Sequence, residues 1–249
     1  MSYIDELGTA AKKAELEMSA VGTITKNTAL RAIADELIRN KDTIIKENKR
    51  DIENAKANGM TEAFIDRLTL TEARIEGMSE GVGQGAELKD PINEIMGGEE
   101  LPNGLVVEKV RVPLGVIGII FESRPNVTVD AAALCLKSGN VCILRGGSDA
   151  IYSNKCLTGI MRRAVSEAGM PEDSIQLVVD TSRAVAGELM KADKYIDVII
   201  PRGGGGLIRS VKQNSTIPVI QTGEGNCHIY IDQFADIDMA VNITDNAKT

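Results

Sequence analysis

The chain has 249 residues, of which 43% are hydrophobic and 26% charged; this composition is typical of a globular protein and excludes a disordered or collagen-like one. Its 28 Lys and Arg residues against 36 Asp and Glu residues give a formal net charge of −8, which disfavours binding to nucleic acid or to an anionic membrane. No apolar run approaches the roughly 20 residues of a membrane span, and the start lacks the pattern of a secretion signal. We therefore expect a cytoplasmic protein without nucleic-acid or membrane partners.

The first hundred residues show the apolar periodicity of helices. Three helical stretches come first, Asn58 and Gly59 stop the third, and a further helix is expected over residues 71–87. Residues 96–104 are expected to form a loop because they contain several glycines and a proline. We therefore expect residues 1–104 to form an N-terminal helical region that packs on the rest of the chain.

From residue 105 the pattern changes to short apolar strands that alternate with helices. The run at 116–121 is apolar throughout, which is typical of a strand buried on both faces of a parallel sheet. This alternation predicts right-handed βαβ units and the α/β fold class, with a parallel sheet in residues 105–249. Further strands are expected at 141–144, 175–179, 196–200, 217–220 and 229–232, and helices at 127–136, 149–168, 182–191 and 204–213.

Three of the expected strands end in loops that each contain an arginine. The loops are residues 122–126 (Glu-Ser-Arg-Pro-Asn), 145–148 (Arg-Gly-Gly-Ser) and 201–206 (Pro-Arg-Gly-Gly-Gly-Gly). Ligands collect at the carboxyl ends of parallel strands, and glycines let backbone N–H groups approach an anion there. Each loop alone is compatible with an ordinary turn and a solvated arginine. Together they predict a polyanionic ligand, with phosphates as the natural candidates.

Several familiar site motifs are absent. The chain has neither the Gly-x-Gly-x-x-Gly fingerprint nor a P-loop, so an ordinary dinucleotide fold or a P-loop kinase is not indicated. Its four cysteines and one histidine lack metal-ligand spacing, and no metal site is expected. Cys227 and His228 are adjacent in a β-like segment, where neighbouring side chains point to opposite faces. A role for Cys227 in packing, or in supporting residues that contact a ligand, is therefore favoured over a nucleophilic one.

Four segments, at residues 112–128, 143–148, 199–205 and 222–232, resemble the γ-glutamyl phosphate reductase (glutamate-5-semialdehyde dehydrogenase) family, a divergent branch of the aldehyde dehydrogenase superfamily. The resemblance runs essentially from end to end. It implies an aldehyde-dehydrogenase-like, Rossmann-type cofactor domain that binds NADP (NADPH). It also implies NADPH-dependent reduction of L-glutamyl 5-phosphate to L-glutamate 5-semialdehyde with release of phosphate, a step of proline biosynthesis from glutamate.

The family's nucleophilic cysteine follows an Asn-Ala-Lys-Thr-like stretch, and this chain has that stretch at residues 246–249. None of its four cysteines stands at the family's catalytic position. The resemblance therefore implies an N-terminal fragment that carries the cofactor half, lacks the catalytic domain and is inactive alone. Gln221 stands about where ordinary aldehyde dehydrogenases carry a general-base glutamate, which suits a reductase that does not hydrolyse its thioester. The complete protein is expected to be a homo-oligomer, with glutamate 5-kinase as a candidate partner.

The resemblance also assigns candidate cofactor contacts. The 145–148 loop matches the superfamily stretch that contacts the adenosine ribose. Ser148 stands where a glutamate would repel a 2′-phosphate, and Arg145 can pair with that phosphate. The 201–206 loop stands where the superfamily places a Thr-Gly-Ser loop beneath the cofactor phosphates. The expected cofactor-binding residues are Arg145, Gly146, Gly147, Ser148, Arg202, Gly203, Gly204, Gly205 and Gly206.

Arg124 and Asn126 are the candidates on the substrate side. A guanidinium can pair with a carboxylate or an acyl phosphate, and the Asn126 amide can donate to a developing oxyanion. The superfamily's oxyanion asparagine lies in this loop, and the choice between the two residues stays open. Two other functions are weighed: a non-catalytic nucleotide- or phosphate-binding module, and an ordinary aldehyde dehydrogenase. The second is disfavoured because Glu-Ser-Arg-Pro-Asn replaces the usual Pro-Trp-Asn motif.

Overall fold

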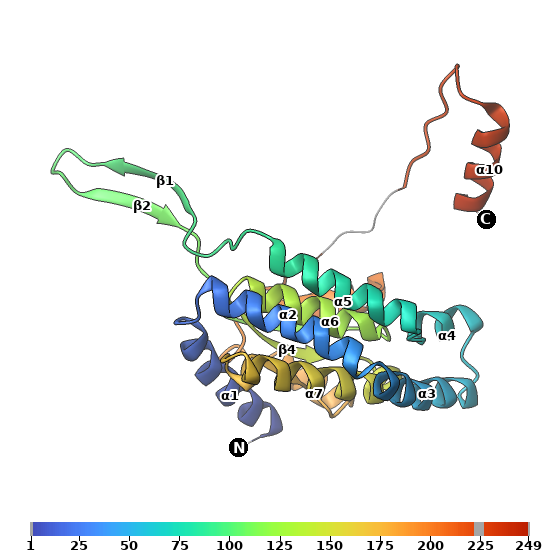
Figure 1. The fold of residues 1–249 in the computed structure, drawn as a ribbon, viewed down its shortest axis with the longest axis horizontal. Helices are drawn as coiled ribbons and strands as arrows, with labels where there is room; N and C mark the ends of the chain where they lie inside the picture. The colour runs from blue at the N-terminus through green and yellow to red at the C-terminus, as the bar shows by residue number, and fades with distance from the viewer. Residues whose placement is uncertain (1, 222–226, 249) are drawn as a thin grey trace.

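The computed structural model describes residues 2–221 and 227–248, and Figure 1 shows their arrangement. Helices come first: α1 (Tyr3–Met18), α2 (Thr23–Arg39), α3 (Lys41–Ala57), α4 (Glu62–Leu68) and α5 (Glu72–Glu87). A hairpin of β1 (Ile95–Glu100) and β2 (Val106–Val110) follows. Strands and helices then alternate: β3 (Val116–Phe121), α6 (Pro125–Lys137), β4 (Val141–Arg145), α7 (Ile151–Glu167), β5 (Ile175–Leu177), α8 (Arg183–Leu189), β6 (Val198–Arg202) and α9 (Gly205–Asn214), with 3₁₀ turns at Ser148–Ala150 and Glu172–Ser174. Helix α10 (Ile237–Lys248) ends the described chain.

Strands β3 to β6 form a parallel sheet in the order β5-β4-β3-β6. All six residues of β3 are buried, as expected for a strand covered on both faces. Its residue Ile119 lies in register with Leu144 of β4 on one side and Ile200 of β6 on the other. The α/β class with a parallel sheet behind a helical region is confirmed.

Helices cover both faces of this sheet. The Nε2 of Gln176 in β5 donates to the carbonyl of Leu7 in α1 at 3.1 Å, and Gln176 lies in register with Ile143 of β4. The neighbouring Cys142 is in contact with Cys135 of α6. Because successive strand residues face opposite sides, α1 and α6 cover opposite faces. Helices α2, α3 and α5 form an outer layer over α6 and α7 (Figure 1). One large hydrophobic core joins these helices to the sheet, and a small separate cluster of Ala55, Leu68 and Ala150 lies under α4.

Two segments differ from the sequence-based expectation. The loop expected at 96–104 is largely strand, because residues 95–100 pair antiparallel with the valine-rich β2; the whole hairpin is exposed and projects from the body (Figure 1). The boundary expected between residues 104 and 105 falls in the turn of this hairpin, and the division there stays a prediction. The strand expected at 229–232 is wrong, since those residues are exposed and have no regular structure.

The region after β6 is less regular than expected. Of the strand expected at 217–220, only a single bridge between Val219 and Ile199 is present. Helix α10 was not expected and has no buried residue. Residues 222–226, which open the fourth family-like segment, lie outside the described residues. No helix within residues 2–221 and 227–248 combines the length and apolarity that a membrane crossing requires.

Buried polar side chains of α3 hold the helical layer to the start of α7. The carboxylate of Asp51 accepts hydrogen bonds from the backbone N–H groups of Tyr152 (3.1 Å) and Ser153 (2.8 Å) and from the Ser153 hydroxyl (2.6 Å). The Asn48 amide donates to the Leu68 carbonyl at 2.9 Å and to the Ser153 hydroxyl oxygen at 3.0 Å. The end of α4 is thereby fixed relative to the helix that follows β4.

We predict that Asp51→Ala lowers the free energy of unfolding by about 2–3 kcal/mol, because it leaves three donors without their buried acceptor. The matched control is Glu53→Ala, an exposed position on the same helix, with an expected change below about 0.5 kcal/mol. Urea denaturation followed by circular dichroism measures both. Equal effects of the two variants would contradict the role given to Asp51.

Candidate functional site

The three arginine-containing loops meet at one edge of the sheet. Arg145, the last residue of β4, lies in register with Ile120 of β3. Arg202, the last residue of β6, lies in register with Phe121 at the end of β3. Arg124 follows three residues after Phe121. Because β3 lies between β4 and β6, the loop that carries Arg124 emerges between the other two.

A cavity of about 530 Å³ lies beside the 145–148 loop. Of the expected cofactor residues it is lined by Arg145, Gly147 and Ser148, and the chain adds Thr181 and Arg183 around the start of α8. The Nη2 of Arg145 donates to the Thr181 carbonyl at 2.6 Å, while its Nε is buried without a partner among the described residues. A buried donor without an acceptor is rare in native proteins. It marks this cavity as a place where an acceptor-rich ligand would fit.

The Arg145 guanidinium is also electrostatically unusual. Desolvation lowers its pKa, and the nearby carboxylate of Asp180 acts against that decrease. A partly buried cation of this kind gains from an anion that replaces the lost hydration.

Gly146 has a packing role. It is buried, and a Cβ atom there would clash with the amide of Asn154 and approach the Phe121 ring at 3.0 Å. Both neighbours are themselves buried. Gly146 is not among the residues that line the cavity, so its lack of a side chain is explained by the packing beneath the loop.

The glycine loop after β6 encloses the carboxylate of Glu122. Gly204 precedes the first residue of α9, and its N–H donates to Oε2 of Glu122 at 3.1 Å. A Cβ on Gly203 would lie 2.7 Å from the Glu122 carboxyl carbon, whereas Gly206 faces open space. A carboxylate of the chain therefore already contacts the start of α9. A ligand phosphate at this point would have to displace Glu122. The contact between Glu122 and Gly204 was not predicted from the sequence.

Arg202, Gly203 and Gly204 do line a cavity, of about 420 Å³. Gly205 and Gly206, the other two members of the run, belong to the first turn of α9 and are not among its lining residues.

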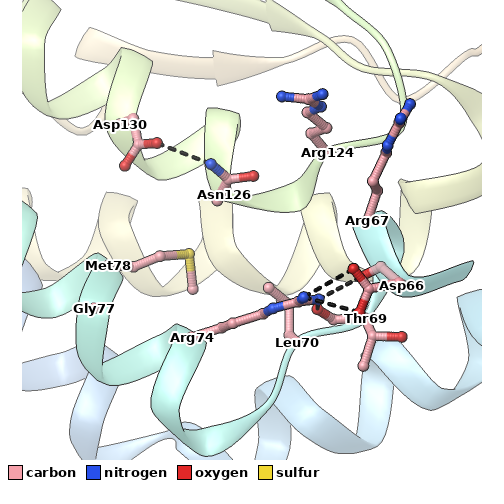
Figure 2. Close-up of a pocket in the computed structure, with 10 residues that line it drawn as sticks. All are labelled: Asp66, Arg67, Thr69, Leu70, Arg74, Gly77, Met78, Arg124, Asn126 and Asp130. Carbon is pink, nitrogen blue, oxygen red and sulfur yellow. Dashed lines mark hydrogen bonds and ion pairs between the residues drawn. The ribbon is translucent and has the colours of Figure 1, made fainter. Parts of the chain in front are cut away.

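Arg124 and Asn126 lie at the start of α6. Arg124 is the residue before the helix, and Pro125 is its first residue, where a missing N–H is tolerated. The Asn126 amide donates to Asp130 one turn later at 3.1 Å (Figure 2). Burial raises the pKa of Asp130, against the opposing effects of Asn126 and Arg202. The Asn126 amide is thus already engaged, whereas the Arg124 guanidinium makes no hydrogen bond or ion pair within the described residues.

Arg124 and Asn126 line a further cavity of about 450 Å³ between α6 and the α4–α5 junction (Figure 2). Arg67 of α4 lines this cavity and also the one beside Arg202. In Figure 2 the side chains of Arg67 and Arg124 extend toward the same side, whereas Arg74 is bound to Asp66 at 2.9 Å. Sequence reasoning missed Arg67, because one arginine in a short helix carries no local signal of a site.

The four cysteines are outside these three cavities. The contact with Cys135 and burial raise the pKa of Cys142, and burial raises that of Cys156. Such thiols are poor nucleophiles, since the thiolate is the reactive form. Cys227 is exposed in the irregular segment before α10. Within the described part of the chain, no group of three or more His, Cys, Asp or Glu side chains could hold a metal ion.

Comparison with known proteins assigns the class. The model of the aldehyde dehydrogenase family matches residues 2–249, so the chain belongs to this family, which implies a nicotinamide cofactor. Curated relatives include γ-glutamyl phosphate reductases of Clostridium novyi, 54% identical over 248 residues, and of Lachnospira eligens, 53% identical over 249 residues. Each match covers 100% of this chain and 60% of the relative.

Solved structures agree. The γ-glutamyl phosphate reductase of Thermotoga maritima matches with a TM-score of 0.91 at 41% identity, over 100% of this chain and 60% of that one. The Saccharomyces cerevisiae enzyme of the same name matches with a TM-score of 0.83 at 34% identity, over 100% and 63%. The chain thus spans about three fifths of the length of these relatives. The resemblance seen in the sequence and the aldehyde-dehydrogenase-like fold are confirmed.

We predict that Gly146→Ala lowers the free energy of unfolding by about 1–3 kcal/mol, the usual cost of forcing a methyl group into a packed core. Gly206→Ala is the matched variant, since a Cβ there meets nothing within 4 Å and the position is helical. It is expected to stabilise the chain by about 0.4–1 kcal/mol. Thermal and urea unfolding compare the two, and a neutral Gly146→Ala would show that the glycine serves something other than packing.

Proposed function

We propose that the natural protein containing this chain reduces L-glutamyl 5-phosphate to L-glutamate 5-semialdehyde with release of phosphate, using NADPH, within proline biosynthesis from glutamate. The observation that carries the proposal is the convergence of Arg124, Arg145 and Arg202 at one sheet edge of an acidic chain. Phosphate groups on both substrate and cofactor suit such an edge. The names of the relatives supply the reaction.

The cavity beside Arg145 is the proposed site for the adenosine end of NADP. The unpartnered Nε of Arg145 and the exposed Ser148 can both donate to a 2′-phosphate. The lining also includes the carboxylates of Glu122 and Asp149, and that of Asp149 accepts the Ser123 hydroxyl at 2.8 Å. When bound, the cofactor supplies a hydride. Glu122 and Ser123 line both this cavity and the one beside Arg202, so ligands in the two cavities would meet across these residues.

On the substrate side we assign Arg124 the larger role. Its guanidinium has no partner within the described residues and can donate to a phosphate or to a developing oxyanion. The Asn126 amide would first have to leave Asp130, so Asn126 is the secondary candidate for the oxyanion contact. Backbone N–H groups of the Gly203–Gly206 run would reach a ligand phosphate only after the Glu122 carboxylate moves away from Gly204. Arg202, which precedes the run, would bind the phosphate directly.

We propose that none of the four cysteines described above is the nucleophile of the reaction. Cys142 and Cys156 have raised pKa values, Cys135 is buried, and Cys227 is not among the residues that line the three cavities. The polypeptide of residues 1–249 is therefore expected to bind ligands without turnover. We also propose that the natural protein is cytoplasmic and that it self-associates through surfaces such as the exposed hairpin. Glutamate 5-kinase is a further proposed partner.

The first test compares the natural gene product with the polypeptide of residues 1–249. Phosphate-dependent reduction of NADP⁺ in the presence of glutamate semialdehyde is measured by absorbance. We predict turnover for the natural product and none above background for the shorter polypeptide. A non-catalytic module would show none in either, and an ordinary aldehyde dehydrogenase would not depend on phosphate. Comparable turnover in the shorter polypeptide would show that one of its four cysteines is the nucleophile, and Cys227→Ser would then test the exposed one.

The second test addresses the cofactor. We predict that Arg145→Ala in the natural gene product raises the KM for NADPH about tenfold, a loss of about 1.4 kcal/mol, and that for NADH less than twofold. The expected difference arises because only NADPH carries the 2′-phosphate. Arg209→Ala, an exposed arginine of α9, serves as control for a general loss of positive charge. Equal effects of Arg145→Ala on both cofactors would remove Arg145 from the 2′-phosphate site.

A further inference from the structure

Arg67 brings a third guanidinium to the cavity beside Arg202. That cavity of about 420 Å³ is lined by Arg67 from α4, Arg124 before α6 and Arg202 from β6. None of the three side chains makes a hydrogen bond or ion pair within residues 2–221 and 227–248. The three come from segments far apart in the sequence, so only the fold brings them together.

The charges around this cavity are unbalanced. Among the described residues that line it, Glu122 is the one acidic side chain, against three arginines, and these four side chains sum to a formal charge of +2. The Glu122 carboxylate is also engaged, since it accepts the N–H of Gly204 at 3.1 Å. Like charges around one hollow repel each other, and a bound anion relieves that repulsion. A charge of +2 matches a phosphate group, which carries close to two negative charges at neutral pH.

Arg67 projects from a fixed point of the backbone. The next residue, Leu68, is fully buried, and its carbonyl accepts the Asn48 amide at 2.9 Å. Arg74, the neighbouring arginine of the adjoining cavity, is held by Asp66 and by the Thr69 carbonyl. Arg74 is thus engaged within the protein, whereas Arg67 remains available to a ligand. Figure 2 shows this difference, with Arg74 bound and the head of Arg67 turned to the side that Arg124 also faces.

We propose that Arg67 is a substrate-binding residue that holds, together with Arg124 and Arg202, the phosphate group of the acyl phosphate and, in the reverse direction, inorganic phosphate. The proposal rests on the proposed function for the identity of the substrate. Its location is consistent with the cofactor site, because Glu122 and Ser123 form a wall common to this cavity and the one beside Arg145.

The test uses the natural gene product with Arg67→Ala and Arg67→Lys. In the phosphate-dependent direction, Arg67→Ala is expected to raise the KM for inorganic phosphate at least tenfold and to change the KM for NADP⁺ less than twofold. Arg67→Lys, which keeps the charge but loses the two-pronged guanidinium, should lie between Arg67→Ala and the wild type. The control Arg209→Ala removes an exposed arginine outside these cavities and is expected to leave both constants within twofold.

Calorimetric titration of inorganic phosphate into the same proteins at fixed ionic strength supplies a readout without turnover. Weaker phosphate binding in Arg67→Ala but not in Arg209→Ala supports the phosphate site, whether or not the wild type has reductase activity. If the wild type lacks that activity, the proposed function is wrong while the phosphate site still stands. An unchanged phosphate affinity in folded Arg67→Ala, or a loss shared equally with Arg209→Ala, overturns the proposal. So does a rise confined to the KM for NADP⁺.

Discussion

Strand β3 is hydrogen-bonded on both sides, to β4 and to β6, and each of its six residues is buried. Burial of such a strand favours the fold by about 25 cal/mol for each Å² of apolar surface removed from water, and a polar side chain within it would lose that gain. Because the register of β3 is fixed, the chain leaves the sheet at Phe121 between Arg145 and Arg202. The positions of the polar groups of the candidate site depend on where the chain leaves the sheet.

The helical layer adds what the sheet edge alone lacks. Asp51 and Asn48 bind α3 to the first turn of α7 and to the end of α4, so α4 lies beside the start of α6. Arg67 then lines a cavity whose other two cations are Arg124, before α6, and Arg202, at the end of β6. An acidic chain thereby brings several arginines to one edge of its sheet, the edge at which we propose that phosphate-bearing ligands bind. Glu122 lines both of the adjoining cavities there.

Local sequence patterns predicted the parallel sheet correctly but did not predict the first strand of the hairpin or the irregular region after β6. The apolar run at 116–121 and its alternation with helices predicted β3 and the parallel sheet, because a strand that is buried on both faces needs apolar side chains at every position. The first strand of the hairpin was missed because glycines and a proline indicate a loop, while its pairing depends on a partner strand across the turn. Residues 229–232 have the composition of a strand but no neighbour to pair with in the described chain. Arg67 and the contact of Glu122 with Gly204 are products of tertiary structure, and no spacing along the chain encodes them.

The two phosphate-binding places that we propose lie on either side of Glu122 and Ser123. A crystal structure of the natural gene product with NADP⁺ and inorganic phosphate would locate both ligands. We expect adenosine 2′-phosphate oxygens within hydrogen-bond distance of Arg145, and a separate phosphate ion in contact with Arg67, Arg124 and Arg202. A 2′-phosphate bound by Arg67 and Arg124, or a phosphate ion that contacts none of these three arginines, would contradict it.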